Sequence, residues 1–184
     1  MLKHVPNILT IIRFFLIPIL FYFALNDNYI VAVIVLILSG ITDVLDGYIA
    51  RKFNFITDFG TLLDPLADKL TQISTLLVLV LRGIIDVWIL AIVIAKELIM
   101  IIGATFLFKK ETIAIPSRWY GKTATVLFYV AIFCSMMEKQ FNLQYSFAIY
   151  LYYIAIAFTI FALFMYLKVF LELRSSSEKN IKES

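Results

Sequence analysis

The sequence has one cysteine, one histidine and few charged residues. Cys134 has no second cysteine to pair with, so an intrachain disulfide is excluded, and we interpret this residue as an inert buried thiol. We interpret His4 as a side chain at the level of the lipid headgroups and not as a metal ligand. The net charge of +3 is small, and we expect no nucleic-acid partner.

Apolar residues dominate what remains. Of the 184 residues, 62% are hydrophobic, and the mean hydropathy of +0.96 is far above that of a soluble domain. Because about 20 apolar residues span a bilayer core, the sequence predicts an all-α, polytopic membrane protein. We expect one membrane domain, residues 1–173, followed by a polar tail, 174–184, that is disordered. The six predicted transmembrane helices are 8–25, 29–51, 59–81, 87–108, 119–137 and 145–167.

Lysine and arginine are distributed unequally between the two sides of this arrangement, and their placement sets the orientation. Only Arg82 and Lys139 fall in turns on the predicted outer side. The segments on the other side hold Lys3, Arg51, Lys52, Lys109, Lys110, Arg118, Lys168, Arg174, Lys179 and Lys182. Both termini are therefore predicted to be cytoplasmic.

Acidic residues recur at fixed spacing between positions 43 and 68. The pattern is D-x-x-D-G-x-x-A-R, eight further residues, and then G-x-x-x-D-x-x-x-D. Carboxylates within membrane-length helices are costly, so they call for a functional explanation. The specified positions are Asp43, Asp46, Gly47, Ala50, Arg51, Gly60, Asp64 and Asp68.

Helical spacing places these residues on two faces. Residues three and four apart share a face, so the first group forms one stripe and the second group another. A turn over 52–57 would set the two helices antiparallel, with four carboxylates facing one another. A divalent cation would offset their repulsion, and all-oxygen ligation favours Mg²⁺ or Mn²⁺. The sequence thus predicts a polar cavity with a metal site, open to the cytoplasm.

The complete pattern resembles the signature of the CDP-alcohol phosphotransferase family. The resemblance implies a homodimeric enzyme of the bacterial cell membrane that moves a phosphatidyl group from a CDP-linked lipid to an alcohol and releases CMP. It implies two divalent cations bound by the four aspartates, with Asp68 as ligand or as general base. It also implies that Gly47, Ala50, Arg51 and Gly60 face the CDP-lipid.

The first predicted span opens with P-N-x-L-T-x-x-R, which is similar to the opening of family members that make glycerophospholipids. By this resemblance Asn7, Thr10 and Arg13 line the pocket for the nucleotide or its phosphates. Two other interpretations remain open, since Asn7 could cap the helix and Arg13 could extend to the headgroups. Pro18 is expected to kink this span.

Basic residues after the acid pattern are candidates for binding the phosphate of the acceptor. Lys96 is predicted to contact this phosphate, although an internal pair with Glu97 would also explain it. The remaining candidates could equally be positive-inside anchors. They are Lys109, Lys110, Arg118 and Lys122.

The sequence indicates two candidate acceptors. The family branch that uses glycerol 3-phosphate typically has cations where this chain has Ala104 and Ala124. Phosphatidylglycerol, which would give cardiolipin, carries less charge and needs fewer cations. We expect glycerol 3-phosphate, because the other basic residues lie close by in the sequence. A cation- or proton-coupled transporter is the alternative of another class, but the acids all lie toward one membrane face.

The cytoplasmic placement of segment 51–58 is testable. With Cys134 replaced by serine, Asn54→Cys should react with an impermeant maleimide in inverted vesicles and not in intact cells. Arg82→Cys, on the predicted outer side, is the control and should give the reverse pattern. Labelling at position 54 in intact cells would contradict the predicted topology.

Overall fold

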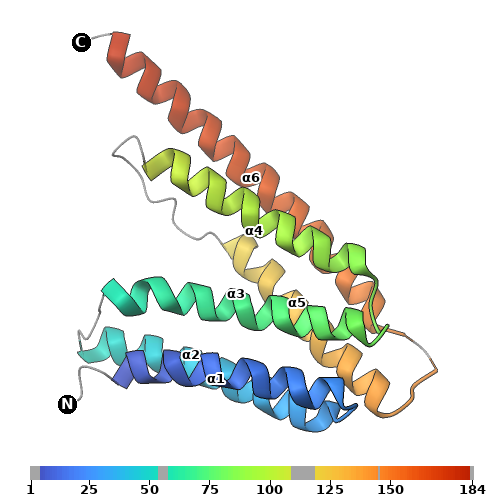
Figure 1. Cartoon of the computed structure of the whole chain (residues 1–184). Helices are drawn as coiled ribbons and strands as arrows, with labels where there is room; N and C mark the ends of the chain where they lie inside the picture. The colour runs from blue at the N-terminus through green and yellow to red at the C-terminus, as the bar shows by residue number, and fades with distance from the viewer. Residues whose placement is uncertain (1–4, 54–57, 109–118, 145, 183–184) are drawn as a thin grey trace. The chain divides into compact units, whose positions relative to one another are not determined.

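The computed structural model describes residues 5–53, 58–108, 119–144 and 146–182, and in these ranges the regular structure is entirely helical. The all-α prediction is therefore confirmed for the described part of the chain. Among these described residues, three segments are long and apolar enough to cross a membrane: 8–25, 29–50 and 148–168. The helices (Figure 1) are α1 (Val5–Leu25), α2 (Tyr29–Phe53), α3 (Asp58–Leu81), α4 (Val87–Phe108), α5 (Trp119–Gln140) and α6 (Ala148–Lys182).

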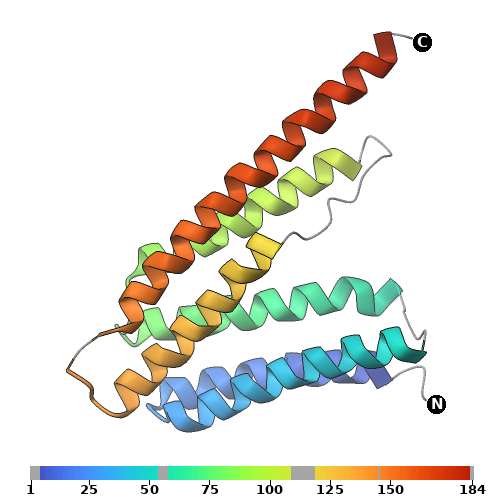
Figure 2. The same ribbon diagram turned by 180° about the vertical axis from the view of Figure 1, so that it is seen from behind.

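The chain forms two compact units, which are described separately. The first contains Met1–Ala91 and Ile132–Ala148, and the second contains Ile92–Ala131 and Ile149–Ser184. In the first unit, α1 packs along both α2 and α3, whereas α2 and α3 touch each other only briefly. Figure 2 shows the same three helices running alongside one another from behind. The helix that carries the opening motif therefore lies against both acid-bearing helices.

Helices α1, α3 and α5 end in the same kind of turn. Each is followed by a residue with a left-handed backbone: Asp27 (φ 60°), Gly83 (φ 64°) and Asn142 (φ 50°). This geometry, with a hydrogen bond back across the last turn, is the Schellman motif, which satisfies carbonyls at a helix end. The closing bonds run from the amides of Asn28, Ile84 and Leu143 to the carbonyls of Phe23, Leu79 and Glu138, at 3.0, 2.9 and 3.0 Å.

Two of these turns are joined by side chains. Arg82 forms an ion pair with Asp27, and the Tyr29 hydroxyl donates a hydrogen bond to the same carboxylate at 2.8 Å. The Tyr29 hydrogen bond and the Arg82 charge hold the pKa of Asp27 below its ordinary value. The pair is exposed to solvent, so it orders the turns more than it stabilises the fold.

In the second unit, α5 and α6 pack through aromatic residues. The rings of Phe128 and Tyr152 lie 6.3 Å apart between centroids, and both residues are fully buried. A Cβ added at Gly121 would lie 3.0 Å from the hydroxyl oxygen of Tyr166. The absent side chain therefore allows Tyr166 to approach α5 closely.

Helix α6 continues to Lys182, whereas the sequence analysis expected disorder from Arg174. The segment has no glycine or proline, and it contains Glu, Lys and Arg, which favour helix. Polarity alone was therefore a poor guide to its backbone conformation.

Buried small residues near the α1–α2 turn predict that a larger side chain there destabilises the protein. Ala32 is completely buried, while Ile34, two residues later, is exposed. Ala32→Leu should destabilise the protein by about 1–3 kcal/mol, because extra methylene groups in a packed interior force strain. Ile34→Leu is the control and should leave the unfolding midpoint, followed by circular dichroism in detergent, almost unchanged. Equal midpoints for both variants would contradict this packing.

Candidate functional site

Arg13 of α1 lies between acidic residues in the first unit. Its guanidinium contacts Asp46 through Nη2 at 2.5 Å and Asp43 through Nη1 at 2.8 Å. The Arg13 side chain is 1% exposed and Asp46 2%, whereas the Asp43 side chain is 47% exposed. The pairing therefore extends from a buried carboxylate to one that solvent can reach.

Thr10 connects α1 to the third helix. Its hydroxyl, which is buried, donates a hydrogen bond to Oδ1 of Asp64 at 2.5 Å. Arg13, on the same face of α1, also reaches the backbone carbonyl of Asp64 through Nη1, at 3.5 Å. Thr10 and Arg13 of the opening motif thus contact acids from both of the other helices.

Asp68 lies one turn beyond Asp64 on α3, and both are half-buried. The spacing of four residues places them on the same face of the helix. Gln72 continues this face by another turn; it is buried, and its amide nitrogen makes no hydrogen bond within the described residues. Gln72 is not among the residues predicted for the site, although the four-residue repeat from Gly60 points to it.

The charges at this site constrain one another. A buried guanidinium without its carboxylate partners would be costly, and removing one partner of a buried pair typically costs about 3–5 kcal/mol. Arg13 is therefore no headgroup-level side chain: it is 1% exposed and paired inside the helix packing. The interpretation of Arg13 as a residue that extends to the headgroups does not hold in this structure.

The sequence comparisons decide the family. The sequence model of the family described as CDP-alcohol phosphatidyltransferase matches residues 3–168. The chain belongs to this family. This membership confirms the resemblance that the aspartate pattern indicated.

Individual proteins similar to this chain support the same family assignment. A Haemophilus influenzae protein named CDP-diacylglycerol--glycerol-3-phosphate 3-phosphatidyltransferase is 34% identical, covering 90% of this chain and 92% of that protein. An Aquifex aeolicus protein of the same name is 35% identical, over 67% of this chain and 70% of that protein. A cardiolipin synthase (CMP-forming) from Streptomyces coelicolor is 32% identical, over 80% of this chain and 64% of that protein.

CDP-alcohol phosphatidyltransferases generally use a divalent metal ion, and the donor set here suits one. Carboxylate oxygens are the ligands that Mg²⁺ and Mn²⁺ prefer, and a positive charge already lies among them as the Arg13 guanidinium. No group of three acidic, histidine or cysteine side chains in the described ranges is already arranged to hold a metal ion.

The other predicted contacts of the CDP-lipid are only partly described. Gly47 and Ala50 are half-buried on α2, on the face that carries the first two aspartates, and Gly60 is buried on α3. Asn7 lies in α1 and Arg51 in α2, but the placement of their side chains falls outside the description. The glycines and Ala50 are thus on the helices that carry the acids, as the pattern predicts.

Two of the predicted acceptor residues lie in the described part of the chain. Lys96 pairs with Glu97 at 2.6 Å in α4, as the alternative interpretation had it, and Lys122 is exposed on α5. Both residues belong to the second unit. Lys109, Lys110 and Arg118 lie outside the described residues.

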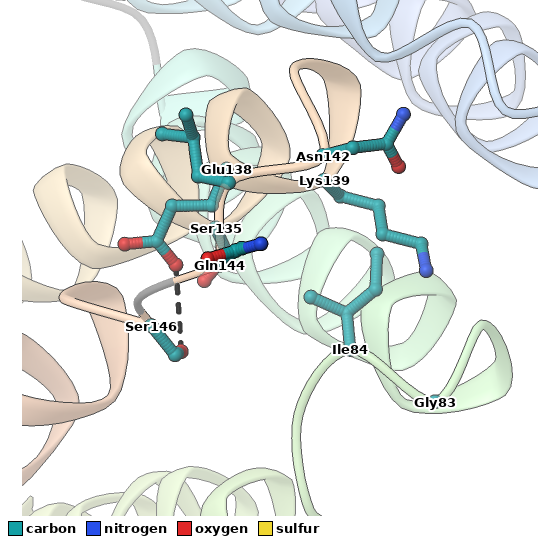
Figure 3. A pocket seen from close by; sticks show the side chains of 9 residues that line it. Gly83, Ile84, Ser135, Glu138, Lys139, Asn142, Gln144 and Ser146 are labelled. Carbon is teal, nitrogen blue, oxygen red and sulfur yellow. Dashed lines mark hydrogen bonds between the residues drawn. The ribbon is translucent and has the colours of Figure 1, made fainter.

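A cavity of about 330 Å³ lies at the opposite end of α3 from the acids (Figure 3). It lies between the turn at Gly83 and the end of α5, and polar side chains predominate in its lining. Glu138 accepts hydrogen bonds there from the amide of Ala148 at 2.8 Å and from Ser146 at 3.4 Å. Its carboxylate thus caps the start of α6, which is a structural role.

Proposed function

We propose that this protein is an integral membrane enzyme that transfers the phosphatidyl group of CDP-diacylglycerol to glycerol 3-phosphate and releases CMP. The observation that carries the proposal is the meeting of Thr10 and Arg13 with Asp43, Asp46 and Asp64, in a chain that belongs to the CDP-alcohol phosphatidyltransferase family. Relatives named for this reaction align over up to 90% of the chain.

The proposed membrane arrangement has six spans, with both termini and a polar cavity at the acids on the cytoplasmic side of a bacterial membrane. Three spans of sufficient length and apolarity support it, together with the unequal distribution of lysine and arginine. A homodimer is implied by the family resemblance. Membership of an enzyme family also argues against the transporter alternative, because a catalytic role accounts for the acidic residues.

The reaction follows from the roles that the family pattern assigns. Asp68 takes the proton from the acceptor hydroxyl, and the freed oxygen attacks the phosphorus that carries the diacylglycerol. A new phosphorus–oxygen bond forms while the bond to the CMP phosphate oxygen breaks, and CMP leaves with that electron pair. Positioning of the two reactants is the main contribution of the protein in such a transfer.

The remaining residues of the site bind the donor. A divalent cation, Mg²⁺ or Mn²⁺, held by Asp43, Asp46, Asp64 and Asp68 would supply stabilisation of the charge on the diphosphate. Thr10 orients Asp64 through its hydrogen bond, which restricts the rotamers of that carboxylate. The proposed donor pocket is completed by Asn7, Gly47, Ala50, Arg51 and Gly60.

The acceptor phosphate is assigned to basic residues of the second half of the chain. Glycerol 3-phosphate carries nearly two negative charges, and each charge-assisted hydrogen bond contributes about 1.5–3 kcal/mol. Several cations are therefore needed to bind it in the presence of the donor. The proposed contacts are Lys96, Lys109, Lys110, Arg118 and Lys122.

Cardiolipin synthesis from phosphatidylglycerol is the second candidate. The chain has alanine at 104 and 124, where the branch that uses glycerol 3-phosphate typically has cations. A phosphodiester carries a single charge and would need fewer of them. The 32% identical Streptomyces coelicolor relative, named cardiolipin synthase, also favours this candidate.

One assay tests the proposed function. Purified protein in detergent, supplied with labelled CDP-diacylglycerol, Mn²⁺ and glycerol 3-phosphate, should release CMP and form phosphatidylglycerophosphate. Excess EDTA should abolish the reaction, because the donor set is proposed to act with a cation. Cardiolipin formed from phosphatidylglycerol, with no phosphatidylglycerophosphate, would favour the second candidate. An absence of CMP release with every acceptor would overturn both.

The proposed base gives a sharper prediction. Asp68→Asn should lower the rate by about 10²–10⁴-fold, because the amide keeps the shape of the side chain but cannot accept the proton. Asp86→Asn makes the same chemical change at an exposed residue just before α4, and it should keep the wild-type rate. If Asp68→Asn retained a tenth of the activity while folded, Asp68 would not be the base.

A further inference from the structure

We propose that Arg13 and a divalent cation compete for Asp43 and Asp46, so that Arg13 is the internal counter-ion of the cation-free enzyme and is displaced when the cation binds. The inference rests on the proposed function, because it concerns the cation of that reaction. Its first ground is the ion pairing itself, at 2.8 Å to Asp43 and 2.5 Å to Asp46.

The second ground is exclusion. A cation bound to the same carboxylate oxygens would meet the guanidinium at contact distance, and like charges in a buried site repel strongly. Occupation by Arg13 and occupation by a cation are therefore alternative states of one set of carboxylates.

The third ground is that one hydrogen-bond donor of the Arg13 guanidinium has no acceptor in the described part of the chain. Its Nε is buried and makes no hydrogen bond within the described residues, although a guanidinium has five donors. A buried donor without an acceptor is unfavourable. The diphosphate of the CDP-lipid offers further acceptors with the geometry that a guanidinium binds well. The displaced Arg13 thus has a better-matched partner in the donor substrate.

The exposure of the acids suggests where the exchange begins. The Asp43 side chain is 47% exposed, whereas Asp46 and Arg13 are almost fully buried. A hydrated cation can reach Asp43 first and can then take Asp46 as the guanidinium withdraws. This order places cation binding before productive binding of the diphosphate.

Competition from Arg13 lowers the apparent affinity of the aspartates for the cation. When a ligand binds only a fraction of the conformations, its apparent affinity falls by that fraction. Arg13→Gln removes the competing charge, so Mn²⁺ should bind the variant at least about tenfold more tightly, the factor that corresponds to losing even one charge-assisted contact. Arg13→Lys keeps the charge but cannot bridge two carboxylates as a guanidinium does, so its Mn²⁺ affinity should be intermediate.

The test is a Mn²⁺ titration of the purified protein in detergent without substrate, followed by electron paramagnetic resonance of free Mn²⁺. Arg82→Gln is the matched control, because Arg82 also pairs with an aspartate, Asp27, at the other end of the helices. It should bind Mn²⁺ like the wild type. Thermal unfolding gives a second readout: Arg13→Gln should unfold at lower temperature without Mn²⁺ and should gain more from saturating Mn²⁺ than the wild type does.

Each outcome is decisive. Equal or weaker Mn²⁺ binding by Arg13→Gln, relative to the wild type, overturns the competition, while CMP release by the wild type would still support the proposed function. If Arg13→Gln does not fold, Arg13→Lys decides in the same way, and unchanged or weaker binding overturns the inference. A lack of CMP release overturns the proposed function, and the Mn²⁺ titration still decides whether Arg13 competes.

Discussion

Arg13 carries the positive charge on which the acid-bearing parts of α2 and α3 depend. Asp43 and Asp46 share a helix face, and Asp64 approaches them from another helix through Thr10 and the carbonyl contact with Arg13. Without a cation among them, these carboxylates would repel each other in a medium that screens charge poorly. The placement of α1 between the two helices is therefore an electrostatic requirement as well as a matter of packing.

This requirement explains the unequal contacts of the three helices. The aspartate spacing predicts that the acids of α2 and α3 face one another directly, but these helices touch only briefly and α1 packs along both. A helix that brings a guanidinium and a hydroxyl can approach acids more closely than another acid-bearing helix can. The buried small residues Ala24 and Ala32, near the α1–α2 turn, allow close approach where no charge is involved.

The sequence predicted the backbone well and the contacts between helices poorly. Apolar runs located the six helices of the described residues, because each run is bounded by a turn or a polar segment. The aspartate spacing located the acids, because it records which residues share a helix face. The partners of Arg13 and Thr10 were not predictable in this way, since the register between helices depends on packing. The end of α6 at Lys182 was missed because polarity was taken as a sign of disorder.

The residue at position 124 bears on which acceptor the enzyme uses. Ala124 is 3% exposed within the second unit, so a lysine there would be an interior charge and not a surface one. Lys122 cannot simply replace it, because residues two apart on a helix point to different sides. If glycerol 3-phosphate is the acceptor, the proposed basic contacts must together supply the positive charge that position 124 lacks. If phosphatidylglycerol is the acceptor, no such balance is needed, and alanine at position 124 fits the single charge of that substrate.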